Sequence, residues 1–495
     1  MENSTNAEVH ILGFYKSTLA YFGGFLLSNA LTLMTLPILA GGLSKGEFGL
    51  LDLYMSVGIL VTVTLAFGMD SSVGRLLSEF KEDGARRRLI LESLLFQSIS
   101  IVAIVLTLYW IAPSIIAFFG EDSAYILPFR LVVVQSGFQA FLNISLNLLK
   151  WTFQKWKFIF LSTVSAISGL IFIWISIYIF NPNIVNVLLA ISASRLLSAL
   201  VGFYLISNFI SFEIPRLYYM GRILRYALPI GIICVLDVTL PVIERNSIFK
   251  FLSTEELGQY AAAARFIAIL AVVVQAFQSA WGPFSLSVMH DEKVGESFEF
   301  TAKIYVITIC LISLSTVMFG KVILFYLFSE AYQNGYILIF PMAMSLVIQS
   351  IGSITGIGII ISNRPYFQLL NYGLFIFVGY VLIGAFTEQY GILGTASALL
   401  ITNTLRTIVI SWAAQCFFYI RWPFKVISAI VVLSLIIGIF LILLLESFGY
   451  IYAGIFFLLS ITILSCGFWF YALDDEEKVV LRAMSLSRSL DKLIQ

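Results

Sequence analysis

The chain is built around unbroken apolar runs that are each long enough to cross a lipid bilayer. One example is VISAIVVLSLIIGIFLILLL, residues 426–445, which contains no charged side chain. In a helix, about twenty apolar residues span the hydrocarbon core of a membrane. Hydrophobic residues make up 60% of the chain and charged residues only 12%, against about 25% charged residues in soluble domains. Together with a mean hydropathy of +0.98, this predicts an all-α, polytopic membrane protein.

Charged and Pro- or Gly-containing breaks divide the apolar sequence into about fourteen predicted membrane spans. The predicted spans cover residues 15–40, 48–75, 89–119, 124–149, 158–180, 184–207, 226–250, 258–288, 301–327, 337–362, 366–387, 391–419, 425–445 and 450–471. The polar start MENSTNAEVH leads directly into a full-length span, so we expect no cleavable signal peptide.

Lysine and arginine gather in alternate loops between the predicted spans. Such residues collect on the cytoplasmic side of a membrane protein. Of the 29 lysines and arginines, those that fall in loops of the opposite side are only Lys45, Arg130, Lys250 and Lys321. Both termini carry the same basic excess as the lysine- and arginine-rich loops. We therefore expect both termini in the cytoplasm.

A seven-residue motif occurs twice between predicted spans. LSKGEFG, residues 43–49, follows the first span, and LSTEELG, residues 252–258, follows the seventh; four of the seven positions are identical. Because six spans separate the copies, both copies face the same side. Arg195 follows ISAS and Arg406 follows TNTL. The interval between these two arginines is nearly the same as the interval between the two motif copies. The pattern predicts two parallel six-helix lobes related by an axis along the membrane normal.

This repeat divides the chain into five predicted segments. They are an N-terminal six-helix lobe at 1–210, a cytoplasmic linker at 211–225, a C-terminal six-helix lobe at 226–420, two additional membrane helices at 421–472 and a cytoplasmic tail at 473–495. Function in repeat architectures of this kind lies between the repeats, near the bilayer midplane. We expect the functional residues of this chain to lie there.

Four arginines fall within predicted spans rather than in loops. They are Arg195, Arg245, Arg265 and Arg406. An arginine at the centre of a membrane helix costs about 2.5–3.5 kcal/mol on insertion scales, so each needs a compensating partner. Arginine binds phosphate oxygens in a bidentate manner. We therefore expect these four residues to bind an anionic, phosphate-bearing substrate.

Amide side chains form a stripe along the predicted span at 124–149. Gln135, Gln139, Asn143 and Asn147 follow one another at intervals of four, which places them on one slowly winding helix face. The stripe fits two roles. It forms hydrogen bonds between helices, or it lines a cavity that receives a hydroxyl-rich substrate.

The predicted seventh span carries two acidic residues on one face. Asp237 and Glu244 lie seven residues apart, and Arg245 follows directly. Pro241 is expected to bend this helix, because proline lacks the backbone N–H and clashes with the preceding turn. The acids either form an internal ion pair with Arg245 or Arg265, or act as the protonatable group that couples transport to protons or sodium ions.

Several classes of function lack support in the sequence. A net charge of +1 gives no general attraction to nucleic acid. The four cysteines and two histidines show no metal-site or disulfide spacing. No nucleotide-binding loop is visible. We expect no cofactor, no metal and no ATP hydrolysis within this chain.

Several stretches resemble a known family in the right order. LPILAGGLSKGEFGLLDLY and LAFGMDSSVGRLLSEF look like the amino-terminal region of Wzx-type oligosaccharide flippases. In the second half, YALPIGI, LSTEELGQYAAAARF and FQSAWGPF sit where related chains read much the same. These flippases belong to the multidrug/oligosaccharidyl-lipid/polysaccharide exporter superfamily. Many relatives carry an acidic–Arg pair in the seventh span, which here is Glu244–Arg245.

The resemblance implies a flippase that moves polyprenyl-diphosphate-linked oligosaccharide repeat units across the plasma membrane for O-antigen, capsule or exopolysaccharide synthesis. The mechanism would be alternating access of two lobes, coupled to an ion gradient. The intramembrane arginines would hold the diphosphate, the amide stripe would meet the sugars, and the polyprenyl tail would stay in lipid. We also expect a monomer that associates with polysaccharide polymerase machinery.

Two alternatives stay open from the sequence. A cation-coupled multidrug exporter of the same superfamily would share the two lobes, but it should favour cavity carboxylates over arginines. A membrane glycosyltransferase or polysaccharide polymerase would be an enzyme with a sizeable outer loop for its catalytic acids. The outer loops here are short, and GEDSA at 120–124 holds the only acidic pair among them. We therefore expect a transporter with no catalytic residues.

Overall fold

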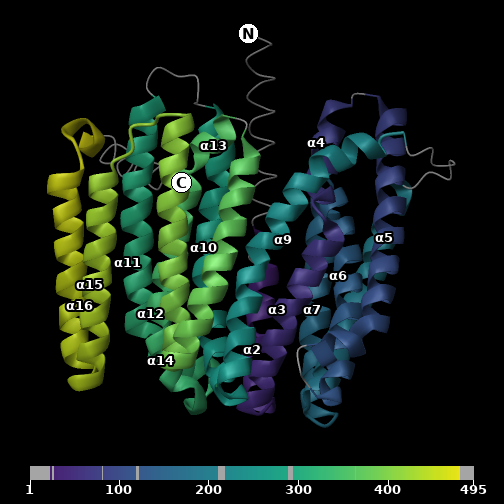
Figure 1. Cartoon of the computed structure of the whole chain (residues 1–495), viewed down its shortest axis with the longest axis horizontal. Coiled ribbons are helices and arrows are strands. Elements are labelled where there is room, and N and C mark those ends of the chain that lie inside the picture. The colour runs from purple at the N-terminus through teal and green to yellow at the C-terminus, as the bar shows by residue number, and fades with distance from the viewer. Residues whose placement is uncertain are drawn as a thin grey trace, which may run out of the picture. The chain divides into compact units, whose positions relative to one another are not determined.

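A computed structural model of the chain describes residues 23–24, 27–80, 82–118, 122–209, 218–287, 294–362 and 364–479. Within these ranges the regular elements are helices, and no strand occurs (Figure 1). The start of the first predicted span, residues 211–217 of the predicted linker and residues 480–495 of the predicted tail lie outside the described residues. The predicted all-α membrane fold is confirmed.

The chain divides into two compact units, the first comprising Met1–Ala261 with Leu327–Ser329. Its elements are α2 (Thr35–Gly42), α3 (Lys45–Ala66), α4 (Met69–Glu79), α5 (Asp83–Phe118), η1 (Ser123–Tyr125), α6 (Ile126–Trp151), α7 (Lys155–Tyr178), α8 (Ile184–Ile206), η2 (Ser207–Phe209), α9 (Met220–Phe251) and the start of α10 (Thr254–Ser287).

The second unit comprises Ala262–Tyr326 and Glu330–Gln495. Its elements are the rest of α10, α11 (Val294–Phe328, up to Tyr326), η3 (Glu330–Gly335), α12 (Tyr336–Thr355), α13 (Ile357–Ile361), α14 (Pro365–Phe417), α15 (Phe424–Ser447), α16 (Tyr450–Gly467) and η4 (Phe468–Ala472). The lobe boundary at 211–225 rests on sequence symmetry and stays a prediction.

Twelve helices of the described chain are long and apolar enough to cross a membrane. A shorter apolar helix, Leu27–Gly42, corresponds to the first predicted span, and the helix at Tyr366–Phe417 contains the two spans predicted at 366–387 and 391–419. The structure therefore agrees with the expected number of crossings. The chain is a multi-pass membrane protein.

The long helix α14 turns back on itself at Gly391. This glycine has φ 64° and ψ −151°, a conformation open almost only to glycine because it has no Cβ. The hydroxyl oxygens of Thr387 and Thr395 lie 2.8 Å apart, whereas eight residues of straight helix would separate them by about 12 Å. Gly391 thus makes a tight helical hairpin.

Helix α6 is central to the packing of the first unit. It contacts α3, α5, α7 and α8 (Figure 1). Its side chains Val132, Val133 and Leu149 are fully buried. Gly202 on α8 lets the two backbones approach, because a Cβ there would lie 2.7 Å from the Ser145 hydroxyl of α6. Small residues at close helix contacts are typical of membrane proteins, where lipid gives no hydrophobic drive to associate.

The second unit is organised around α12, whose most apolar stretch is 78% buried. Hydrogen bonds join it to the second half of α14: Asn403 Nδ2 donates to Ser345 Oγ at 2.8 Å, Thr407 Oγ1 donates to the Ile348 carbonyl at 2.9 Å, and the Thr355 and Ser411 hydroxyls lie 2.6 Å apart. In the absence of water such bonds hold helices together. Helices α15 and α16 lie side by side at the end of the chain (Figure 1).

The start of α9 is fixed to the first unit by an acidic side chain from another helix. The buried Glu92 of α5 accepts hydrogen bonds from the backbone N–H groups of Tyr218 and Tyr219, at 3.1 and 2.8 Å. These residues directly precede α9, where unpaired N–H groups and the helix dipole favour a carboxylate. Arg222 adds an exposed ion pair with Glu79, at 2.7 Å. The contacts explain why α9 belongs to the first unit.

Candidate functional site

Both copies of the repeated motif begin a helix with the same cap. Before α3, Ser44 Oγ accepts from the Glu47 N–H at 3.3 Å, and Glu47 Oε2 accepts from the Ser44 N–H at 3.1 Å. Before α10, Ser253 and Glu256 repeat the pattern at 3.2 Å in both directions. This reciprocal capping box satisfies two N–H groups that a helix start leaves unpaired. The two glutamates thus lie in the first turns of α3 and α10.

The last glycine of each motif is the point at which the two helix starts meet. A Cβ on Gly49 of α3 would lie 2.5 Å from the backbone nitrogen of Gly258 on α10. A Cβ on Gly258 would collide with the Lys45 carbonyl. Only glycine permits so close a backbone approach. The repeated sequence therefore builds a contact between its own two copies.

Next to this contact, three helices of the first unit bring together a buried acid–arginine cluster. Arg245 of α9 donates from Nε to Asp52 Oδ2 of α3 at 2.8 Å, and its Nη1 lies 3.4 Å from Glu244 Oε2. Tyr260 of α10 donates its hydroxyl hydrogen to the same Glu244 oxygen at 2.6 Å. Arg245 Nη1 also donates to the carbonyl of Pro241 at 3.1 Å. The acid–arginine cluster is thus Asp52, Glu244, Arg245 and Tyr260.

The electrostatics of the acid–arginine cluster favour one exchangeable proton. The side chains of Asp52 and Glu244 are only 5% and 7% exposed, and that of Arg245 is 12% exposed. Two carboxylates share one guanidinium, so the three groups carry a charge of −1 when all are ionised. An unbalanced buried charge is costly, and a proton on either carboxylate neutralises the cluster.

Sequence reasoning found only half of this cluster. Glu244 and Arg245 were predicted as candidates, whereas Asp52 and Tyr260 were not. The predicted second acid, Asp237, is an exposed residue of α9 and lies two helical turns before Glu244. The sequence did contain one indication of the role of Asp52. Asp52 lies three residues after the first copy of the repeated motif, and this copy meets the second copy near the start of α10.

Arg195 lies at a different helix interface of the same unit. Its Nη1 donates to Ser165 Oγ of α7 at 2.7 Å. The neighbouring hydroxyls of Ser168 and Ser194 are 2.9 Å apart, and Ser198 lies 3.4 Å from Ser168. This serine-rich contact between α7 and α8 accommodates the half-buried guanidinium with neutral hydrogen-bonding groups.

The amide stripe of α6 is divided among three environments. Gln135 is buried, donates weakly to Met55 Sδ at 3.9 Å, and its Oε1 has no partner among the described residues. Gln139 donates to Asn143 Oδ1 at 2.8 Å. Asn147 lines a small cavity with Asp70 and Gln97, among other residues. Gln135 thus contacts a residue of another helix, whereas the half-buried Gln139 and Asn143 bond to each other.

A polar pocket surrounds Arg406 in the second unit. It has a volume of about 150 Å³ and is lined on its polar side by Gln349, Ser353, Gln368, Tyr372, Arg406 and Thr407. The guanidinium of Arg406 lies over the Tyr372 ring, 4.8 Å from its centroid. Gln278 of α10 donates to Ser353 Oγ at 3.2 Å. The polar lining groups are one cation, amides and hydroxyls, which suit an anionic or hydroxyl-rich ligand.

Arg265 and the motif FQSAWGPF belong to the same unit. Arg265 is half-buried in α10, one turn past Ala261. Trp281 is 5% exposed and packs against Phe298 and Trp422, with ring centroids 5.1 and 6.3 Å away. This aromatic cluster has a structural role. Among the described residues, no group of three or more His, Cys, Asp or Glu side chains could hold a metal ion.

The fold of the chain is similar to those of solved membrane transporters. The chain is similar to a multidrug resistance MATE family transporter of the MOP superfamily in an inward-facing conformation, with a TM-score of 0.66 and 17% identity over 82% of this chain and 94% of the other. It is also similar to the lipid II flippase MurJ in an inward closed conformation, with a TM-score of 0.69 and 16% identity over 91% and 99% of the two chains.

Sequence comparison then identifies the particular family. The model of the polysaccharide biosynthesis protein family matches residues 14–289, and the chain belongs to this family. A similar curated protein is Lsg locus putative protein 1 of Haemophilus influenzae, 21% identical over 285 residues that cover 57% of this chain and 68% of that protein. The family predicted from the sequence motifs is confirmed.

Proposed function

We propose that this protein is a flippase that moves polyprenyl-diphosphate-linked oligosaccharide repeat units across the bacterial plasma membrane for surface polysaccharide synthesis. The observation that carries the proposal is the joint one: a polysaccharide biosynthesis family match on a chain with the fold of a lipid II flippase. The protein works by alternating access of two lobes. The repeat unit that it moves is a precursor of O-antigen, capsule or exopolysaccharide.

The polar pocket around Arg406 supports a substrate that carries phosphate and sugar. A guanidinium offers paired N–H donors that match phosphate oxygens, and in a site away from water such bonds are strong. Gln349 and Gln368 offer the donors and acceptors that sugar hydroxyls need. The proposed substrate-contacting set also includes three further arginines and the amide stripe of α6. These residues are Arg195, Arg245, Arg265, Gln135, Gln139, Asn143 and Asn147.

We propose that the acid–arginine cluster couples transport to an ion gradient. Asp237, an exposed acid on the same helix as Glu244, is a further candidate for this role. Glu244 would exchange a proton while Arg245 and Tyr260 hold its carboxylate in place. Because Asp52, Arg245 and Tyr260 come from three helices, a change in the charge of Glu244 alters a contact between helices. Proton binding and helix rearrangement would be linked in this way.

A second candidate function is export of cationic drugs. The similarity to a multidrug resistance MATE transporter favours it. A drug exporter would lower cellular sensitivity to organic cations and would leave lipid-linked glycans unaffected by its deletion. Deletion of a flippase would instead alter lipid-linked glycans and leave the sensitivity to organic cations unchanged.

The deciding experiment measures on which leaflet lipid-linked repeat units accumulate after the gene is deleted. We expect complete units on the cytoplasmic leaflet, restored to the outer leaflet by the wild-type gene. Arg406→Ala should fail to restore them, Arg406→Lys should restore them in part, and Arg87→Ala, which changes an exposed arginine of α5, should restore them fully. Incomplete units would point to a transferase, and unchanged glycan display would reject the flippase.

A further inference from the structure

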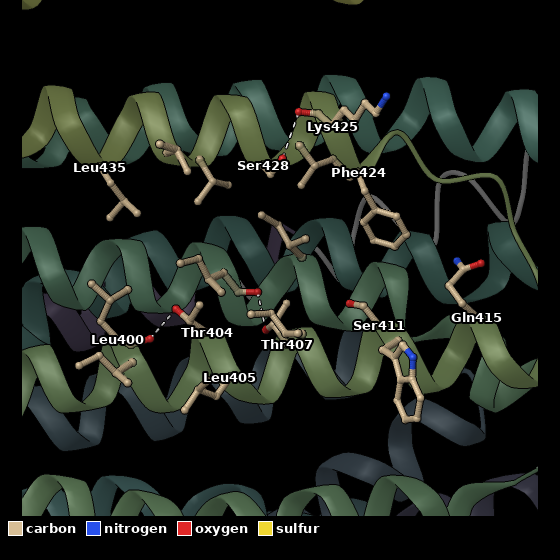
Figure 2. A pocket seen from close by; sticks show the side chains of 18 residues that line it. Leu400, Thr404, Leu405, Thr407, Ser411, Gln415, Phe424, Lys425, Ser428 and Leu435 are labelled. Atoms are coloured by element: carbon tan, nitrogen blue, oxygen red, sulfur yellow. Dashed lines mark hydrogen bonds between the residues drawn. The ribbon is translucent and has the colours of Figure 1, made fainter.

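A deep apolar groove runs along one face of the second unit, and the proposed function does not use it. The groove has a volume of about 920 Å³ and lies between α12, the second half of α14, and α15 (Figure 2). We call it the α12–α14–α15 groove. Aliphatic side chains from all three helices form most of its wall, including Ile348, Ile351, Leu405, Ile408, Ile427 and Val431.

Most polar groups of the wall have partners inside the protein; the exception is Gln415, whose Nε2 has no partner among the described residues. Thr404 Oγ1 donates to the Leu400 carbonyl at 2.7 Å, Thr407 Oγ1 donates to the Ile348 carbonyl, and Ser411 is bonded to Thr355. These side chains therefore present only their methyl and methylene groups to an occupant of the groove. Water would therefore find little to bond to along this wall, and a hydrocarbon chain fits it better.

The two ends of the groove differ in chemistry. Gln415, Phe424 and Lys425 lie at one end, and Leu400 and Leu435 lie at the other (Figure 2). Lys425 is exposed and is the one charged residue in the wall described by the structure. The charge distribution of the sequence predicts that this end faces the cytoplasm. The groove thus has a cationic mouth at the membrane surface and an apolar interior.

The length of the groove matches one leaflet of the bilayer. Lys425 and Leu435 are separated along α15 by a helical rise of about 15 Å, and the hydrocarbon core of a bilayer is about 30 Å thick. An occupant held by its head group at Lys425 would therefore place its chain alongside the wall down to the bilayer midplane. A phospholipid of the adjacent leaflet has this length and orientation.

We propose that the α12–α14–α15 groove is a binding site for an anionic phospholipid of the leaflet on the Lys425 side. The ammonium group of Lys425 pairs with the lipid phosphate, and one acyl chain occupies the groove between α14 and α15. The lipid stabilises the contact of α15 with the rest of the second unit. This site takes a different ligand from the polar pocket around Arg406, with which it shares only Thr407 in its lining.

The test uses the purified full-length protein in nanodiscs that contain equal amounts of phosphatidylglycerol and phosphatidylcholine, followed by release into detergent and native mass spectrometry. We expect a retained phosphatidylglycerol molecule. Lys425→Ala should lower its retention about fivefold, the effect of one basic side chain at an anionic surface, and Lys425→Arg should preserve it. Leu405→Trp, which fills the groove, should abolish it.

The matched control is Leu433→Trp, because Leu433 is an exposed leucine of α15 that does not line the groove. It should leave lipid retention unchanged. Equal retention of phosphatidylcholine, equal loss with Leu433→Trp, or a dimer that excludes the lipid would each overturn the proposal. So would displacement of the phosphatidylglycerol by an equimolar polyprenyl phosphate, which would assign the groove to a prenyl chain.

Discussion

Arg245 and Asp52 are separated by 193 positions in the sequence, yet Arg245 Nε donates to Asp52 Oδ2 at 2.8 Å. The pair connects α9 to α3 near the contact of the two repeated motifs. Both side chains are almost fully buried. Removing one partner of a buried pair leaves the other charge uncompensated, which is more costly than removing both.

This pair gives a prediction about stability. Arg245→Ala leaves two buried carboxylates without their guanidinium, so it should lower the free energy of unfolding by about 3–5 kcal/mol. Asp52→Ala leaves Arg245 paired with Glu244 and should cost about 1–3 kcal/mol, and the double variant should lose less than the sum of the two. Thermal unfolding of the four proteins in detergent measures the coupling. The control, Glu388→Ala, removes an exposed acid of α14 and should stay within about 0.5 kcal/mol of wild type. If the loss in the double variant equalled the sum of the two single losses, the interaction between Asp52 and Arg245 would contribute nothing to stability.

The glycine contact between the motif copies gives a second prediction. Gly49→Ala places a Cβ against the backbone of α10, so we expect a loss of about 1–3 kcal/mol through overpacking and a reduced yield of folded protein. The measurement is size-exclusion chromatography with a thermal melt. Gly384→Ala is the matched control, because a Cβ at Gly384 meets no atom within 4 Å. A Gly49→Ala protein as stable as that control would contradict the close approach.

A third prediction separates proton coupling from folding. Glu244→Gln keeps the shape of the side chain and the hydrogen bond from Tyr260 but removes the titratable carboxylate. We expect an inserted protein whose transport no longer responds to an imposed proton gradient, measured in vesicles with inward or outward pH steps. Glu388→Gln, at an exposed position of α14, should respond normally. If Glu244→Gln retains the full response, the proton is bound elsewhere.

The hairpin of α14 supplies a fourth prediction. Gly391→Ala forces a Cβ into a backbone conformation that costs about 1–3 kcal/mol for other residues. The second half of α14 carries Arg406 and packs on α12, so we expect a lower melting temperature. Gly373→Ala is the control, since a Cβ at Gly373 meets nothing within 4 Å. Its melting temperature should equal or exceed that of wild type, because alanine favours the helix; equal melting of both variants would show that the hairpin tolerates a side chain.

The sequence by itself determined that the apolar runs are helices and where they approximately lie. It did not show every break: the span predicted at 48–75 is two helices, α3 and α4, separated at Phe67 and Gly68, which both have positive φ. Each apolar run must form a helix because lipid offers no partner to backbone N–H and C=O groups, and the capping boxes at Ser44 and Ser253 act within four residues of chain. These are local effects, so periodicity and composition are enough to predict them. The repeat could also be recognised from identity at matching positions, although its purpose could not.

Only the tertiary structure decided which groups compensate each intramembrane arginine. The insertion cost says that Arg195, Arg245 and Arg406 need partners, but the partner comes from another helix whose rotation and depth are set by packing. The structure gives Arg195 serine hydroxyls, Arg245 two carboxylates and Arg406 an aromatic ring within a polar pocket. Three residues that look equivalent in sequence thus have different chemistry, because side-chain environment in a membrane bundle is a property of the helix interface.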